Sequence, residues 1–111
     1  GINFTHQGNT IFATWFTYDL TRNPLWYSVT APQTAPNTFT GTLYRTAGPA
    51  YSAQPFNSDL VRHIPIGTAT LTFTNGNAGT FAYQVADGAN VANQTKAITR
   101  QVFRAPGTVC Q

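Results

Sequence analysis

The sequence predicts an all-β domain made of successive antiparallel hairpins. Three observations lead to this prediction: short segments rich in β-branched and aromatic residues recur, turn-forming sequences separate them, and no stretch sustains a helical hydrophobic period. The 111 residues are close to the commonest domain size and too few for two separate cores. We therefore expect one domain over residues 1–111, folded as an antiparallel up-and-down barrel or a two-sheet sandwich of about six to eight strands. The barrel is slightly preferred, because closure removes sheet edges that invite aggregation.

Strands are expected where polar and apolar residues alternate or where aromatic and β-branched residues cluster. Both tryptophans lie in one hairpin, over residues 14–29, which we take as the element that organises the sheet. Residues 104–111 are interpreted either as a tail or as a strand that pairs with the N-terminal segment to close the sheet. The expected strands are Thr10–Asp19, Leu25–Thr30, Thr38–Thr46, Gly67–Thr74, Thr80–Ala86 and Thr95–Phe103, with Gly1–Gln7 as a candidate edge strand.

The connecting segments are rich in Gly, Pro, Asn and Asp. Asp19–Pro24 reads DLTRNP, a turn in which Asp and Asn side chains bond the nearby backbone. Asn75–Gly79 is a strong hairpin connection, since Asn and Gly tolerate positive φ. Asp87–Gln94 is a further Gly/Asn-rich turn, and Ala31–Asn37 is a loop with two prolines. Ala47–Pro65, the longest irregular segment, is expected to contribute to a functional site or to pack down as a lid.

Strand alternation assigns side chains to opposite faces of the sheet. Trp26 and Tyr27 are adjacent and therefore point to opposite faces, with Tyr27 on the more apolar face and Trp26 among hydroxyl side chains. We expect Trp15 to belong to the core. Gly41 is expected to mark a bulge or a close backbone approach. Arg45 lies within a strand, so it is expected to point outward or to pair with an Asp.

The composition excludes several functional classes. Charged residues make up only 8% of the chain, against about 25% in an average soluble domain. The six basic residues are scattered, which argues against nucleic-acid binding, because that function needs a dense basic patch. No stretch approaches the roughly 20 apolar residues of a membrane helix, so membrane insertion is not expected. Low charge, abundant Thr and the absence of Met favour a secreted or cell-surface protein.

The single cysteine, Cys110, has no partner within the chain. An internal disulfide is therefore excluded. In an exported protein a lone cysteine indicates an intermolecular bond or a free thiol. Cys110 is thus the candidate for a disulfide between chains.

Five motifs are spread along the chain: WFTYD at 15–19, PLWY at 24–27, GTLYRTAGP at 41–49, GTATLTF at 67–73 and KAITRQVF at 96–103. Together they resemble a recurring β domain of exported bacterial proteins, found alone or appended to larger secreted proteins. The resemblance covers most of the chain and implies export and an all-β fold, without any activity or catalytic residue. Many such domains have a glycine in the turn at residues 20–23, and we expect Asn23 to take the left-handed conformation here.

The polar surroundings of the aromatic residues point to carbohydrate as the ligand class. Sugars present flat C–H faces that stack on aromatic rings, while amide and hydroxyl side chains bond their OH groups. The candidate ligand-binding residues are Trp26, Tyr44 and Tyr51, together with Asp19 and Arg22 in the hairpin turn. The alternative interpretations are that the aromatic residues belong to the core and that Asp19 bonds its own backbone.

Catalytic and metal sites are not expected. A glycosidase needs two positioned carboxyl groups, whereas this chain has three dispersed Asp residues and no Glu. Ser58, Asp59 and His63 fall in one short segment, while a catalytic triad normally draws on separate elements. His6 and His63 lack the paired spacing of metal ligands. We therefore predict a protein that is not an enzyme and uses no cofactor.

The predicted function is an exported, non-catalytic binding or adhesion module directed at carbohydrate or a cell-surface polymer. The main alternative is a structural subunit that self-assembles into a homo-oligomer or filament, through its N-terminal edge strand and Cys110. A second alternative is a carrier of small apolar ligands, although so short a barrel is expected to be filled by its own side chains.

Overall fold

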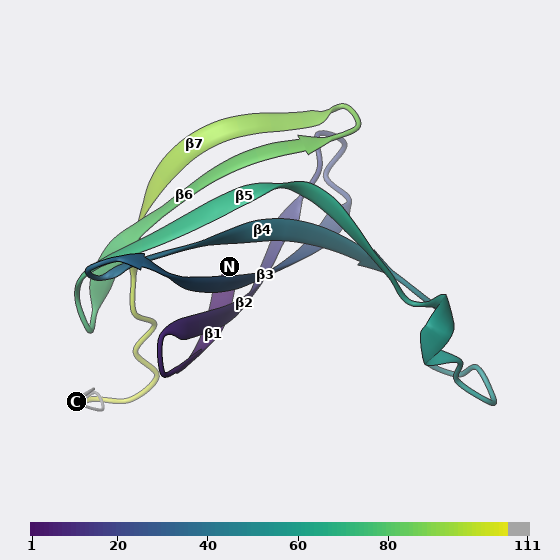
Figure 1. The fold of residues 1–111 in the computed structure, drawn as a ribbon, viewed down its shortest axis with the longest axis horizontal. Helices are drawn as coiled ribbons and strands as arrows, with labels where there is room; N and C mark the ends of the chain where they lie inside the picture. Colours follow the sequence, from purple (N-terminus) through teal and green to yellow (C-terminus); the bar gives the residue numbers. More distant parts are fainter. Residues whose placement is uncertain (107–111) are drawn as a thin grey trace.

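The computed structural model describes residues 1–106 and contains one antiparallel sheet of seven strands that curls into a half-barrel (Figure 1). The strands are adjacent in the sheet in the same order as in the sequence, which confirms the up-and-down all-β prediction and excludes the two-sheet sandwich. Among the described residues, no helix is long and apolar enough to cross a membrane. The elements are β1 (Ile2–Gln7), β2 (Thr10–Tyr18), β3 (Pro24–Ala35), β4 (Thr38–Ala47), η1 (Ser58–Leu60), β5 (Arg62–Asn75), β6 (Ala78–Asp87) and β7 (Asn90–Thr99).

The connection between β3 and β4 is shorter than the sequence indicated. β3 continues through Pro32 to Ala35, so the expected loop over Ala31–Asn37 shrinks to two residues. The pairing of β3 with β4 is interrupted between Val29 and Gln33, and Pro32, which cannot donate a backbone hydrogen bond, lies in this gap. The loop prediction is therefore wrong, because the tertiary pairing tolerates a residue that lacks an N–H.

The connection between β6 and β7 is also tighter than expected. Gly88 adopts a φ of 62°, a conformation open to glycine, and the chain reverses within residues 88–89. β7 therefore begins at Asn90 and ends at Thr99, whereas the sequence predicted a turn to Gln94 and a strand to Phe103. Two amide side chains of β7 have protein partners: Oδ1 of Asn90 accepts a hydrogen bond from the backbone N–H of Leu20 at 3.3 Å, and Oε1 of Gln94 accepts one from the hydroxyl of Tyr83 at 2.8 Å.

The core lies on the concave side of the half-barrel. Tyr27 is buried there, as predicted, and Trp15 packs against the core. The ring centroid of Trp15 lies 4.5 Å from that of Tyr83 and 5.0 Å from that of Phe81. Because these contacts reach from β2 to β6, they hold the sheet in its curled form. The buried core residues are Ile11, Ala13, Tyr27, Val29, Ala31, Phe39, Leu43, Ile66, Ala69, Leu71, Phe81, Tyr83 and Val85.

Gly41 marks a close approach of two backbones, as predicted. A Cβ atom at this position would collide with the carbonyl oxygen of Thr30 on β3 and would lie 2.9 Å from Cγ2 of Val29. Glycine is therefore required here for the close approach of β3 and β4.

Residues 48–61 form an arm that projects from the end of the β4–β5 hairpin (Figure 1). The side chain of Asn57 accepts a hydrogen bond of 3.0 Å from the backbone N–H of Asp59 and so caps η1. The arm points away from the sheet, so it does not pack down as a lid. β5 begins at Arg62, earlier than the sequence predicted.

Candidate ligand-binding surface

The outer face of the β2–β3 hairpin carries a cluster of exposed aromatic side chains. Trp26 lies opposite Phe16 in the β2–β3 register, and their ring centroids are 5.3 Å apart with an interplanar angle of 32°. Trp26 nevertheless remains 59% exposed. Phe12 and Tyr18 are exposed on the same face of β2. We call Phe12, Phe16, Tyr18 and Trp26 the outer aromatic cluster.

Strand alternation explains why β2 is aromatic on both faces. Trp15 points into the concave core, so its neighbour Phe16 must point outward, and the same parity places Phe12 and Tyr18 outside. The sequence predicted Trp26 as a site residue but missed its three partners. The signal was present, because parity groups Phe12, Phe16 and Tyr18 on one face. Which face is open to solvent could not be decided from alternation alone.

Neutral polar side chains surround the outer aromatic cluster. Ser28 lies opposite Thr14 beside the Trp26–Phe16 pair, and Asn3 of β1 lies on the other side of Thr14. Their hydroxyl and amide groups can donate and accept hydrogen bonds. No charged side chain lies on this face of β1–β3. The non-aromatic residues of this face are Asn3, Thr5, Gln7, Thr10, Thr14, Pro24, Ser28, Thr30 and Pro32.

Tyr44 shares the outer face with Trp26. It lies opposite Ser28 in the β3–β4 register, which makes it the diagonal cross-strand neighbour of Trp26, at about 7–8 Å between the Cα atoms. Tyr44 is half-buried, and its ring meets His63 edge-on at 6.3 Å between centroids. The structure thus brings together Trp26 and Tyr44, two of the predicted site residues.

Asp19 organises the turn that closes the β2–β3 hairpin. Its Oδ1 accepts hydrogen bonds from the backbone N–H of Asn23 at 2.9 Å and from the backbone N–H and hydroxyl of Thr21 at 2.8 Å each. The bond from the Asn23 backbone, followed by that from the Thr21 hydroxyl, lowers the pKa of the Asp19 carboxyl below its usual value. Asp19 therefore bonds its own turn, which is the alternative interpretation from the sequence.

Arg22 takes the left-handed conformation in this turn, with a φ of 70°. The expectation that Asn23 would take it is wrong by one residue. The backbone N–H of Arg22 donates a hydrogen bond of 3.0 Å to the carbonyl oxygen of Asp19, so the turn closes at Arg22 and not at Asn23. The exposed turn lies at the end of the hairpin that carries Trp26, so a ligand-contacting role for Arg22 stays a prediction.

Two other predicted residues do not join this surface. Tyr51 lies on the projecting arm and is 98% exposed, so it stands apart from Trp26 and Tyr44. Cys110 lies outside the described residues. Its role in a disulfide between chains stays a prediction.

The concave side holds a polar network that joins three strands. Nε of Arg45 donates a hydrogen bond to Oδ1 of Asp87 at 3.1 Å, and the hydroxyl of Tyr27 donates to Oδ2 at 3.1 Å. The sequence predicted an ion pair for Arg45 as one of two alternatives, but not its partner. Burial, and next the bond to Asp87, raise the pKa of Tyr27 to about 12. Over residues 1–106, no group of three or more His, Cys, Asp or Glu residues could hold a metal ion.

A hollow of about 550 Å³ lies on the outer face beside Thr5, Gln7, Thr10 and Phe12. Among the described residues, two further cavities open where the half-barrel is incomplete. The larger of these two, about 360 Å³, lies between β1 and β7, and we call it the edge cleft. The smaller, about 150 Å³, lies at the opposite end, where β2 approaches β6 and β7. The edge cleft is lined by Ile2, Asn3, Phe4, Phe73, Gly76, Asn77, Ala78, Gly79, Ile98, Thr99, Arg100 and Gln101.

No protein-family model, curated protein or solved structure matches the chain. A function must therefore be inferred from the structural features described above. The resemblance to a β domain of exported bacterial proteins therefore stays a prediction.

Proposed function

We propose that this protein is an exported, non-catalytic binding or adhesion module whose outer aromatic cluster binds carbohydrate. The observation that carries the proposal is Trp26, which is 59% exposed although it lies beside Phe16. A large aromatic ring left in water on a rigid sheet can stack on the C–H face of a sugar. A rigid platform also loses little conformational entropy on binding.

The polar neighbours of Trp26 fit the same ligand class. Ser28, Thr14 and Asn3 offer neutral donors and acceptors at the rim of the cluster. Sugar hydroxyl groups need such partners, whereas an anionic polymer would need positive charge. Because the face carries no charged residue, binding is expected to change little between low and physiological salt.

Export to the medium or the cell surface forms part of the proposal. The chain has only 8% charged residues and no Met, a composition that supports export. A carrier role for small apolar ligands is less well supported, because the concave side is filled by the core side chains. A role in self-assembly rests on a different part of the molecule, the open sheet edges.

The test is binding of the purified protein to a glycan array and to insoluble polysaccharides in pull-down assays. Trp26→Ala should weaken binding by about 2 kcal/mol, or roughly thirtyfold, because a central exposed Trp is a typical hot spot. Trp26→Phe should retain part of the affinity. Tyr51→Ala is the matched control, since it removes an exposed aromatic ring from the arm, and it should bind like the wild type. Near-UV circular dichroism checks that each variant is folded.

Two results would overturn the proposal. One is the absence of binding to every glycan and polysaccharide offered. The other is a Trp26→Ala variant that is folded and binds as tightly as the wild type. Binding that falls steeply with added salt would instead indicate an anionic ligand recognised elsewhere on the protein.

A further inference from the structure

Within residues 1–106, the edge cleft separates two strands that each pair on one side only. β1 bonds β2, and β7 bonds β6, and the sheet order ends with these two strands. The wall of the cleft is largely apolar, with Ile2 and Phe4 from β1, Phe73 from β5 and Ile98 from β7. The ring of Phe4 lies 5.4 Å from that of Phe73, so β1 is held over the core while its outer edge stays open.

The number of strands explains why the half-barrel does not close on itself. In an antiparallel meander of seven strands, the first and the last run in the same direction. Direct pairing of β1 with β7 would be parallel. A single additional strand placed between them would be antiparallel to both and would complete a barrel of eight strands. Eight strands form a barrel just wide enough to be filled by its own side chains.

Both edges present backbone groups to such a strand. Gly1 and Phe16 exchange two hydrogen bonds of 2.9 Å where the pairing of β1 with β2 begins. In an antiparallel pair, hydrogen-bonded and non-hydrogen-bonded residue pairs alternate. Ile2 and Phe4 therefore direct their N–H and C=O groups away from β2. At the other edge, the N–H of Arg100 donates a hydrogen bond of 2.9 Å to the carbonyl oxygen of Asn77. By the same alternation, the backbone groups of residues 95, 97 and 99 in β7 point away from β6. β1 contains neither Pro nor a charged residue, so it lacks the usual protection of an edge.

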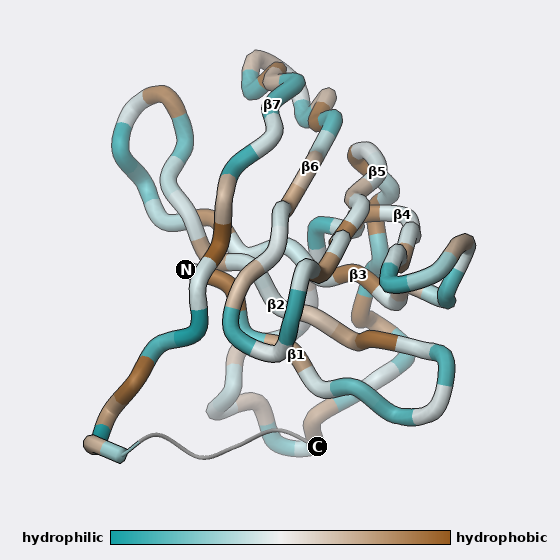
Figure 2. The backbone as a smooth tube through the Cα atoms, turned by 90° about the vertical axis from the view of Figure 1, so that its left-hand side faces the viewer, coloured by the Kyte–Doolittle hydropathy of each residue, from teal (hydrophilic) through white to brown (hydrophobic). Residues whose placement is uncertain are grey.

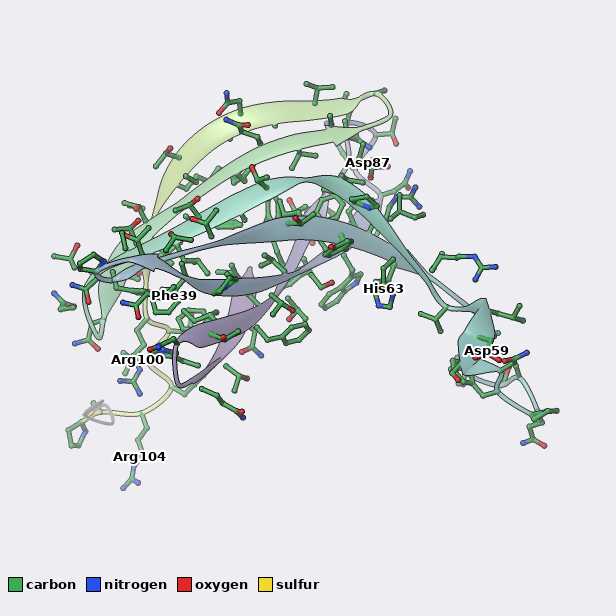
Figure 3. All side chains as sticks on the ribbon, in the orientation of Figure 1. Phe39, Asp59, His63, Asp87, Arg100 and Arg104 are labelled. Carbon is green, nitrogen blue, oxygen red and sulfur yellow. The ribbon has the colours of Figure 1, made fainter. Side chains whose placement is uncertain are left out.

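The segment that follows β7 supplies suitable side chains. Arg100 still bonds Asn77, and Arg100 and Gln101 line the edge cleft of their own molecule. Residues 102–106 leave the sheet, and Figure 2 shows their hydrophobic part clear of the strands. Phe103 is 91% exposed and Val102 is 58% exposed. In Figure 3 the side chain of Arg104 lies well away from the sheet. Residues 102–106, when extended, span about 17 Å, enough to pair with five of the six residues of β1.

This segment cannot readily fold back into the edge cleft of its own chain. An antiparallel return after Thr99 requires a tight hairpin, which depends on Gly, Asn or Asp at the turn. Residues 100–106 read RQVFRAP and contain none of these. A second molecule, by contrast, can offer its cleft in any orientation.

We propose that residues 102–106 of one molecule insert as the eighth strand into the edge cleft of a second copy. Phe103 then points into the cleft, against Phe4 and Ile98. Val102 and Arg104 have the opposite parity and point outward. Each molecule both donates a strand and accepts one, so the contact is heterologous and builds rings or filaments.

The test uses sedimentation velocity of the full chain over a range of concentrations, in reductant so that Cys110 cannot cross-link molecules. The wild type should associate as its concentration rises. Phe103→Ser removes the inserted ring and should weaken self-association at least about tenfold. Val102→Ser is the matched control on the opposite face of the segment and should associate nearly as well as the wild type.

A second variant blocks the acceptor side. Ala97→Pro removes an N–H that points to the open edge and leaves the β6–β7 ladder intact, so the variant should fold but accept no strand. Thr95→Pro removes the neighbouring outward-pointing N–H of β7 and replaces Ala97→Pro if that variant is unstable. Phe103→Ser can accept a strand but not donate one, whereas Ala97→Pro can donate a strand but not accept one. Each variant alone should therefore remain monomeric, and a mixture of the two should form one-to-one dimers.

Three results would overturn the inference. The first is a wild type that remains monomeric at all concentrations. The second is an equal effect of Val102→Ser and Phe103→Ser. The third is a mixture of the two blocked variants that stays monomeric. Trp26→Ala should leave assembly unchanged, so the outcome is independent of the carbohydrate-binding proposal.

Discussion

Arg45 on β4 and Asp87 at the end of β6 form an ion pair of 3.1 Å between residues 42 positions apart in the sequence. The side chain of Asp87, labelled in Figure 3, is only 12% exposed. It also accepts a hydrogen bond from the hydroxyl of Tyr27 on β3. One carboxylate therefore ties together strands β3, β4 and β6 on the concave side. A largely buried carboxylate is tolerated here because both of its oxygens have a hydrogen-bond donor.

Removing this carboxylate should destabilise the fold. Asp87→Ala leaves the Arg45 guanidinium and the Tyr27 hydroxyl without their partner, and we expect the free energy of unfolding to fall by about 2–3 kcal/mol. Chemical denaturation measures the change. Asp59→Ala on the arm should alter stability by less than about 0.5 kcal/mol. Equal losses in the two variants would contradict the role given to the network.

Stability should decline in alkaline solution because of Tyr27. Its pKa is raised from 10.0 to about 12 in the folded state, so between these pH values the unfolded chain has lost a proton that the folded chain keeps. The contribution is fully present below pH 10 and is lost as pH rises through 12, to a total of about 3 kcal/mol. Denaturation at several pH values should show this extra slope in the wild type and not in Tyr27→Phe. An identical slope in both proteins would refute it.

Arg22→Gly should stabilise the protein. Arg22 has a φ of 70°, which costs a residue with a Cβ about 1–2 kcal/mol, whereas glycine adopts it freely. After allowance for the greater freedom of glycine in the unfolded chain, the gain should be about 0.5–1 kcal/mol. Thermal unfolding measures it. Arg22→Ala keeps the Cβ and should show no gain, so stabilisation of both variants would point to lost charge and not to the backbone.

Gly41→Ala should be strongly destabilising. The added methyl group would collide with the Thr30 carbonyl oxygen, and β3 and β4 would have to separate. We expect a loss of about 2–3 kcal/mol in the free energy of unfolding. Gly48→Ala provides the control, because its added Cβ meets only Val61, with the nearest atom at 3.2 Å. A folded Gly41→Ala variant with unchanged stability would show that the two strands are not held as closely as described.

Local patterns predicted the parts of the fold that depend on neighbouring residues. Alternation placed Tyr27 inside and Trp26 outside, and both placements are confirmed, because side-chain direction along a strand has a period of two. The limits of β3 and β7 were predicted less well. Pro32 and the amide residues of β7 resemble loop residues, and only strand pairing shows that they are accommodated within the sheet.

The sequence by itself thus determined the all-β class, the hairpin order and the two faces of most strands, since these follow from short-range periodicity and turn chemistry. Only the tertiary structure decided which face is concave, and hence that Phe12, Phe16 and Tyr18 join Trp26 in water. It alone brought Asp87 to Arg45 and, within residues 1–106, left β1 and β7 apart as the two edges of the sheet. Those relationships depend on register and curl summed over seven strands, and no window of neighbouring residues contains that information.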